Sequence, residues 1–168
     1  MERKSTGAVA AFRSLSGFLS WVGGIGIFLL MIPTVLDVAY RYTYGASLAG
    51  MVEYSEVGIV FVVYLGVAKA MQDGVHIATP VVTSRLAPRR AETARLAGQF
   101  VLWALVAYAV YRTGLSAIDA TRIGEFRLGY VSVPTWPARI MVTFGFALLF
   151  IEIGIEIVER LRRLAAHR

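Results

Sequence analysis

The chain has 168 residues, of which 57% are hydrophobic and only 17% are charged, with a formal net charge of +6. A soluble domain carries about 25% charged residues, so the surplus of apolar side chains indicates a protein that faces lipid. The absence of cysteine excludes disulfides and thiolate metal sites, and two histidines in polar flanks argue against a haem site.

The first apolar segment predicts a membrane-spanning helix at about residues 15–40, with Asp37 as its only formal charge. It is longer than the apolar core of a signal peptide, about 7–15 residues, so we expect an uncleaved helix. Small residues of this segment permit close approach of another helix. They are Gly17, Ser20, Gly23, Gly24 and Gly26.

The second apolar segment, residues 52–71, organises the chain. Its 20 residues predict a helix of roughly 30 Å, which is the thickness of a hydrocarbon core. Glu53 and Glu56 lie at one end and Lys69 at the other. A charge at a helix end can pair or reach the interface, so this segment predicts a spanning helix with polar ends.

Two further spans are predicted at residues 96–118 and 138–158, separated by a loop over residues 120–137. The basic stretch before the third span, residues 81–96, leaves two interpretations open. It is either a short amphipathic helix at the membrane surface, broken near Pro88, or a solvated loop. The fold expected is therefore all-α, an integral membrane protein with four transmembrane helices in a single membrane domain.

Orientation follows from the lysines and arginines in the short connections. The N-terminal segment, the central loop and the tail share eleven, whereas the opposite side has five. We therefore expect both termini in the cytoplasm (N-in/C-in). The same distribution, with basic residues at the ends of segments, fits membrane topology better than a nucleic-acid interface, so no nucleic acid is expected as a partner.

Charged residues at the outer ends of the spans are the first candidate site. Asp37 and Arg41 are four residues apart and share a helix face, and Glu53 and Glu56 begin the next helix on the same side. We expect one outer cluster in which Arg41 faces these carboxylates, with Arg139 as a second cation. The cluster is either a packing and register device or a cation or proton site, and we favour the first.

At the inner ends, helical rise places Lys69 at a depth similar to that of Glu152 and Glu156. An unpaired ion at this depth is costly, so we expect Lys69 to contact one of these carboxylates, with Asp73 as the competing partner. His76 follows the second helix and acts either as a pH switch or as a helix cap. We expect no catalytic residue, metal ligand or cofactor.

The ordered set of these residues resembles the small membrane subunit of tripartite ATP-independent periplasmic (TRAP) transporters. The similarity covers Arg41 to Glu152 and the four-helix layout. The residues that support the similarity are Arg41-Tyr42, Glu53 and Glu56, Gly66-Val67-Ala68, His76-Ile77, the Val133–Trp136 stretch and Phe146–Glu152. Two features depart from the family pattern: Met51-Val52 stands where a tryptophan is common, and Tyr54 and Ser55 separate acids that are often adjacent.

The resemblance implies an accessory subunit, not an enzyme, in the bacterial cytoplasmic (inner) membrane. The system would be a Na+-coupled secondary transporter for organic acids or similar solutes. Its expected partners are the large membrane subunit, a periplasmic solute-binding protein and the lipid bilayer. This chain would brace the large subunit and would help to dock the binding protein. A face combining the first two helices is one candidate interface, although spacing alone does not choose it.

Three alternatives belong to other classes. A self-sufficient small proton- or cation-coupled transporter would require an acid near the bilayer middle, whereas the acids here lie toward the ends of the spans. A redox or other enzyme subunit is disfavoured by the lack of cysteine and the scarcity of histidine. A membrane assembly protein unrelated to transport fits the spans equally well.

Overall fold

The computed structural model describes residues 7–72, 88–129 and 131–166, and these form four long helices and one short β-ribbon. Each helix is long and apolar enough to cross a membrane. The predicted all-α fold with four spanning helices is confirmed, whereas the N-in/C-in orientation stays a prediction. The elements are α1 (Gly7–Tyr44), α2 (Met51–Gln72), α4 (Pro88–Ile123), β1 (Phe126–Arg127), β2 (Val133–Pro134) and α5 (Trp136–Ala166).

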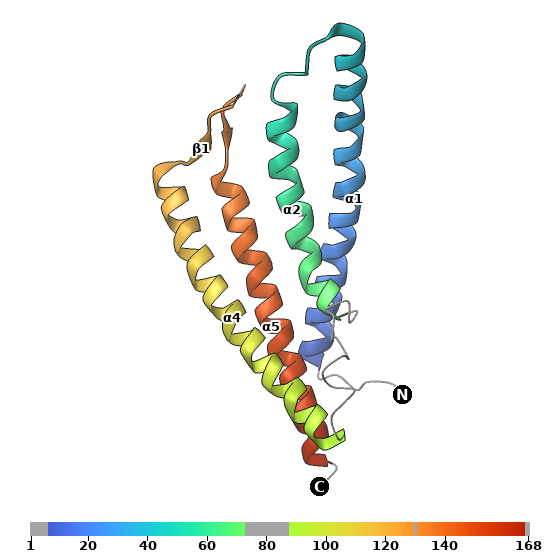
Figure 1. Ribbon diagram of the computed structural model, residues 1–168, viewed down its shortest axis with the longest axis vertical. Coiled ribbons are helices and arrows are strands. Elements are labelled where there is room, and N and C mark those ends of the chain that lie inside the picture. The colour runs from blue at the N-terminus through green and yellow to red at the C-terminus, as the bar shows by residue number, and fades with distance from the viewer. Residues whose placement is uncertain (1–6, 73–87, 130, 167–168) are drawn as a thin grey trace.

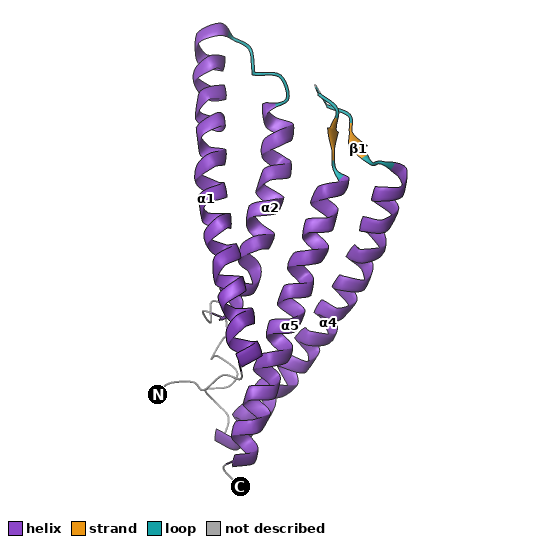
Figure 2. Ribbon diagram, turned by 180° about the vertical axis from the view of Figure 1, so that it is seen from behind, coloured by secondary structure: helices purple, strands orange, loops and turns teal. Residues whose placement is uncertain are grey.

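The helices form two antiparallel hairpins, α1–α2 and α4–α5, that lie side by side (Figure 1). The hairpins meet through α2 and α5, so the order across the layer is α1, α2, α5, α4, as the view from behind also shows (Figure 2). We call the end that holds both hairpin connections the outer end. The inner end holds the start of α1 and the end of α5. Within the described residues the helices thus form one layer, with α1 and α4 at its edges.

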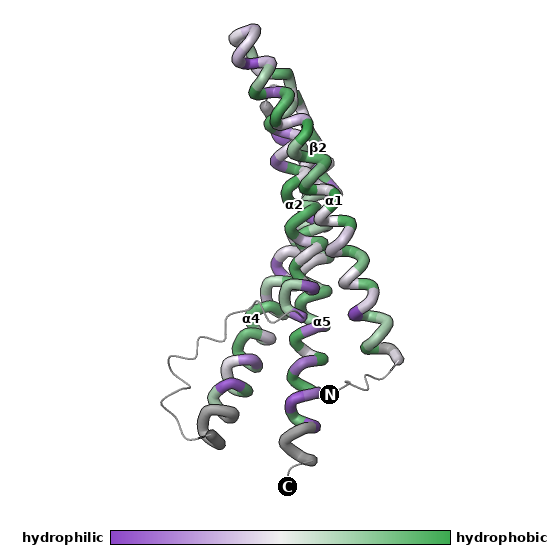
Figure 3. Tube along the Cα trace, turned by 90° about the vertical axis from the view of Figure 1, so that its right-hand side faces the viewer, coloured by the Kyte–Doolittle hydropathy of each residue, from purple (hydrophilic) through white to green (hydrophobic). Residues whose placement is uncertain are grey.

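The hydropathy of the chain follows this layout. Hydrophobic residues occupy the central stretches of the helices, and hydrophilic ones gather toward their ends (Figure 3). In the most apolar stretch of α2, none of the described residues is buried within the chain, although α2 lies between two neighbours. Both broad sides of the layer are therefore apolar and accessible, as lipid or another membrane protein would require.

The helices extend beyond the predicted spans at several ends. The first helix begins at Gly7 instead of near residue 15, and the third begins at Pro88 instead of near residue 96. Proline is well suited to the first turn of a helix, because the amide hydrogen that it lacks has no intrahelical acceptor there. The expected break near Pro88 is therefore wrong: a helix starts at this residue and continues as the third span. Residues 81–87 of the proposed amphipathic stretch lie outside the described residues.

The outer connection between α4 and α5 is also more ordered than the predicted loop. α4 ends at Ile123 in the usual way, because the next residue, Gly124, has φ +60° and adopts the left-handed conformation that favours glycine. β1 and β2 then pair antiparallel, with Phe126 opposite Pro134 and Arg127 opposite Val133. Two-residue strands give a weak periodic signal, which explains why the sequence did not predict them.

Glycines set the spacing between neighbouring helices. A Cβ at Gly23 would lie 3.1 Å from the carbonyl oxygen of Val62, and one at Gly26 would lie 2.8 Å from its side chain. A Cβ at Gly145 of α5 would lie 2.9 Å from the carbonyl oxygen of Tyr64 in α2. Such close approach is characteristic of packing between membrane helices. Part of the small-residue face predicted in the first helix therefore packs against α2.

The buried core lies toward the inner half of the α4–α5 hairpin, and α2 contributes to it. Trp103 of α4 stacks on Phe150 of α5 with ring centroids 4.7 Å apart, and Tyr64 of α2 meets Phe146 edge-on at 5.5 Å. The buried members of the core are Val106, Leu149, Ile153 and Ile157. This core ties the second hairpin to α2 and leaves α1 attached mainly through α2.

Candidate functional site

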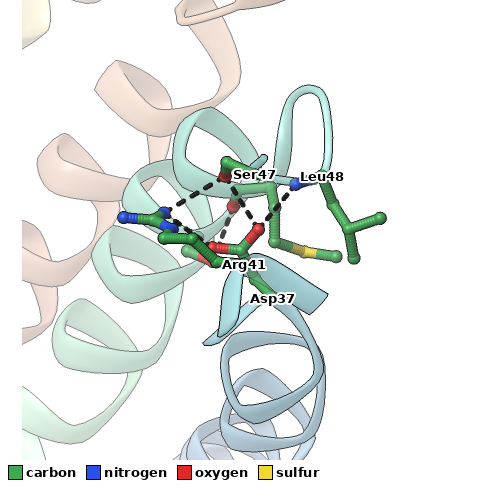
Figure 4. A network of polar contacts seen from close by, with 6 residues as sticks. Asp37, Arg41, Ser47 and Leu48 are labelled. Atoms are coloured by element: carbon green, nitrogen blue, oxygen red, sulfur yellow. Dashed lines mark hydrogen bonds and ion pairs between the residues drawn. The ribbon is translucent and has the colours of Figure 1, made fainter. Parts of the chain in front are cut away.

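A network centred on Asp37 closes the outer end of the first hairpin (Figure 4). The Asp37 carboxylate accepts hydrogen bonds from Arg41 Nη2 at 2.9 Å, from Ser47 Oγ at 2.8 Å and from the Leu48 backbone nitrogen at 2.7 Å. Asp37 is only 5% exposed, so these partners replace the water that a free carboxylate would bind. The network fixes the connection between α1 and α2.

The local sequence explains how this connection forms. Arg41 lies in the last turn of α1, where a cation is favoured by the helix dipole. Gly45 follows with φ +70°, and its backbone nitrogen donates to the Arg41 carbonyl oxygen at 2.9 Å, which caps the helix. Gly50, with φ +81°, reverses the chain into α2. The pairing of Asp37 with Arg41 follows from their spacing, whereas the Ser47 and Leu48 donors could not be placed from the sequence.

A second polar contact joins α2 to the ribbon. Arg127 of β1 forms an ion pair with Glu56, and both side chains are about half exposed. Glu53, one turn earlier in α2, lies against Gly129, whose missing side chain leaves room for the carboxylate. The ribbon therefore packs over the start of α2.

A third polar contact joins α4 to α5. Two nitrogens of the Arg139 guanidinium contact Glu125: Nε lies 2.6 Å from Oε2, and Nη2 lies 2.7 Å from Oε1. Arg139 Nη1 also donates to Ser116 Oγ of α4 at 2.7 Å. A bidentate arginine–carboxylate pair is among the stronger charged contacts in proteins.

Of the expected single outer cluster, the structure brings Asp37 and Arg41 together, whereas Glu56 and Arg139 pair with other residues. Among the described residues, three carboxylates each have an arginine of their own, in the pairs Asp37–Arg41, Glu56–Arg127 and Glu125–Arg139. The sequence missed Arg127 and Glu125 as partners because their positions depend on the ribbon and on its register.

Two hollows at the outer end share Glu53. One, of ≈ 180 Å³, lies between α2, the ribbon and the start of α5, and the other, of ≈ 640 Å³, lies beside the α1–α2 connection. The smaller hollow is lined by Glu53, Glu56, Val57, Val60, Arg127, Val133, Thr135 and Ala138. In the described part of the chain, no group of three or more acidic or histidine side chains is placed to hold a metal ion.

At the inner end, Glu152 of α5 joins three helices. Its carboxylate accepts from Arg13 Nε of α1 and from Gln72 Nε2 of α2, each at 3.4 Å. Arg13 Nη2 also lies 3.0 Å from Glu159 Oε1. Glu152 is only 3% exposed, so this contact holds the start of α1 against both α2 and α5.

Three other residues were expected to take part in contacts at the inner end: Lys69, His76 and Glu156. Glu156 pairs with Arg160 one turn later on α5, at 3.4 Å. The predicted contact of Lys69 with Glu152 or Glu156 stays a prediction, and His76 lies outside the described residues. The sequence missed Arg13 as a partner because we placed the helix start near residue 15, beyond this arginine.

The polar contacts thus bind the elements of the layer to one another at its two ends. The middle of the layer is apolar except for Arg112 of α4, and it presents large side chains on its surface, among them Trp21 (74% exposed) and Phe28 (66%). Such a chain is built to be held in the bilayer and to present broad apolar surfaces.

Comparison with known proteins identifies the family. Residues 30–163, more than half of the chain, match the family described as tripartite ATP-independent periplasmic transporters, DctQ component. No curated protein and no solved structure matches the chain. The match confirms the resemblance found in the sequence and assigns the chain to a transporter component and not to an enzyme. The chain belongs to the DctQ family and is the small, multi-pass membrane component of a tripartite ATP-independent periplasmic transporter.

Proposed function

We propose that this chain braces the large membrane subunit of a Na+-coupled transporter in the bacterial cytoplasmic membrane. The transporter would take up organic acids or similar solutes that a periplasmic binding protein delivers. The family supports association with other transporter components, and the resemblance implies the coupling ion and the class of solute.

The observation that carries the proposal is the single layer of helices. In the order α1, α2, α5, α4 the buried core is confined to contacts between neighbouring helices, so the described residues do not surround a path for a solute. Their charged contacts lie toward the outer and inner ends, where they hold helices together. A flat, apolar layer of this kind is suited to packing against a larger membrane protein that contains the path.

The outer end would also help to dock the binding protein. Under the predicted N-in/C-in orientation, both hairpin connections face the periplasm. Exposed aromatic side chains, Tyr42 (93% exposed) and Tyr44 (73%), lie beside the connection that Asp37 fixes. Aromatic residues on a rigid support are frequent at the centres of protein interfaces.

Co-purification tests the bracing role. The tagged chain is expressed with the large hydrophobic membrane protein encoded beside it and extracted in a mild detergent. We expect a complex of one copy of each. If the chain purifies alone, or only with further copies of itself, the proposal is overturned and the small self-sufficient transporter is favoured. Ion-flux assays in liposomes would then test that alternative.

A further inference from the structure

Arg112, one of the five basic residues that the sequence assigns to the side opposite the termini, lies at mid-depth of the layer and not at its outer end. Gly114 of α4 faces Thr143 of α5, with 3.7 Å between the position of a Cβ at Gly114 and the Thr143 methyl group. Because the two helices are antiparallel, Arg112 is level with Gly145, which packs against the Tyr64 backbone of α2. Tyr64 is the fourteenth of the 22 residues of α2, roughly 12 Å from the nearer end of that helix.

The side chain of Arg112 is exposed on the face of α4 that points away from the rest of the chain. Trp103 and Val106 pack toward α5, and helical spacing places Arg112 on the opposite side from Trp103. Its own face carries Tyr108 (64% exposed), one turn toward the inner end, and Leu105 (61%), two turns toward it. The same face continues to the exposed Asp119, two turns toward the outer end, so α4 presents an apolar strip that holds Arg112 and ends at Asp119.

Arg112 has no ion pair or hydrogen-bond partner among the described residues, unlike Arg13, Arg41, Arg127 and Arg139. An arginine at this depth is costly when it faces hydrocarbon alone, and such residues usually face a protein partner or a water-filled cavity. The opposite edge of the layer offers no comparable group. Between Arg13 and Asp37, α1 has no formal charge, and its exposed side chains include Trp21 and Phe28.

We propose that the outward face of α4, centred on Arg112, docks against a membrane helix of the large subunit that presents a carboxylate at the same depth. The inference rests on the proposed function and specifies its interface. Charge complementarity selects the partner: a carboxylate would neutralise Arg112, and apolar side chains around it would cover Tyr108 and Leu105. The edge formed by α1 then faces lipid. This assignment differs from the face of the first two helices that we considered from the sequence.

Site-specific photocrosslinking in membrane vesicles that contain the assembled complex tests the interface. A photoreactive phenylalanine derivative replaces Tyr108 in one variant and Trp21 in another. The two positions are both aromatic, both exposed, and at similar depths on opposite edges of the layer. We expect crosslinks to the large subunit from position 108 and crosslinks to lipid alone from position 21.

The charge is tested by substituting Arg112 in the same co-expression system. Arg112→Gln would leave the partner's carboxylate unpaired, so we expect at least about a tenfold loss of large subunit recovered with the chain. Arg112→Lys keeps the charge and should retain more of the complex. Arg122→Gln, at the outer end of the same helix, is the control and should leave recovery unchanged. The thermal stability of the isolated Arg112→Gln chain should not fall, since no contact of the described chain is removed.

The outcomes separate this inference from the proposed function. A complex that forms normally, but crosslinks to the large subunit from position 21 and not from position 108, would overturn the interface and keep the bracing role. Lipid crosslinks from position 108, with normal recovery of Arg112→Gln, would show that this face of α4 meets lipid and would likewise overturn the inference. The absence of any complex with the unsubstituted chain would overturn both.

Discussion

Replacing Gly145 by alanine should separate the two hairpins, because this glycine lies where they meet. The new Cβ would lie 2.6 and 2.7 Å from two Tyr64 side-chain carbons and 2.9 Å from the Tyr64 carbonyl oxygen. Rotation of the tyrosine relieves only the contact with its ring carbon Cδ1. The Cβ and the carbonyl oxygen are both fixed to the backbone, so α2 and α5 must move apart by roughly 0.5–1 Å to restore ordinary contacts.

The magnitude follows from the packing around this position. Overpacking a close contact costs about 1–3 kcal/mol, and the shift also weakens the edge-on contact of Tyr64 with Phe146. Alanine offsets part of this cost, since it is favoured over glycine within a helix by about 0.5–1 kcal/mol. Gly24 provides the matched control, because a Cβ there meets nothing within 4 Å. Gly24→Ala should be neutral or slightly stabilising, so the two variants should differ by about 1–3 kcal/mol.

This difference is measured by thermal unfolding in detergent. Circular dichroism and the monodispersity of the heated sample report the extent of unfolding. Gly145→Ala should unfold at a lower temperature than both the unsubstituted chain and Gly24→Ala. Removing the tyrosine ring in the double variant Gly145→Ala, Tyr64→Ala should not restore stability, because the carbonyl oxygen remains. Equal stability of Gly145→Ala and Gly24→Ala would refute the close approach of α2 and α5.

Three further predictions concern the polar contacts. Asp37→Asn removes the charge of a buried carboxylate that three donors contact and should lower the unfolding free energy by about 1–3 kcal/mol. Asp119→Asn, at an exposed position, should change it little in the same thermal assay. Glu152→Gln should lower the stability of the chain but leave Na+-driven uptake intact in complexes that still assemble. Loss of uptake with assembly unchanged would instead indicate a transport role for this carboxylate. A double-mutant cycle on Glu56 and Arg127, which are both substantially exposed, should give a coupling below about 1 kcal/mol, and a coupling of several kcal/mol would contradict the exposure seen here.

The sequence predicted the helices well because their signal is strong and continuous. Stretches of about 20 mainly apolar residues are typical of a membrane span, and the lysine and arginine distribution adds an expected orientation. The ends of the helices were less predictable. A helix continues into polar residues at no cost to its backbone hydrogen bonds, so α1 includes Arg13 and α4 begins at Pro88.

The polar contacts were predicted only where both partners belong to one helix. Asp37 and Arg41 are an example, since a separation of four residues places them on the same face. The partners of Glu56 and Glu152 come from other elements, and their identity depends on the register between those elements. Register is set by the close contacts of glycines and by the ribbon, which hydropathy does not reveal. The mid-depth position of Arg112 likewise emerges only when α4 is aligned with α5.

Reconstituted transport tests the central claim, that this chain supports a transport path located in another subunit. Proteoliposomes would contain the large subunit, this chain, or both, with the loaded binding protein outside and an inward Na+ gradient. We predict no Na+-dependent solute uptake with this chain alone and full uptake only when both membrane subunits are present. Na+- or proton-driven uptake by this chain alone would contradict the account, because the described layer of helices would then have to contain a path of its own.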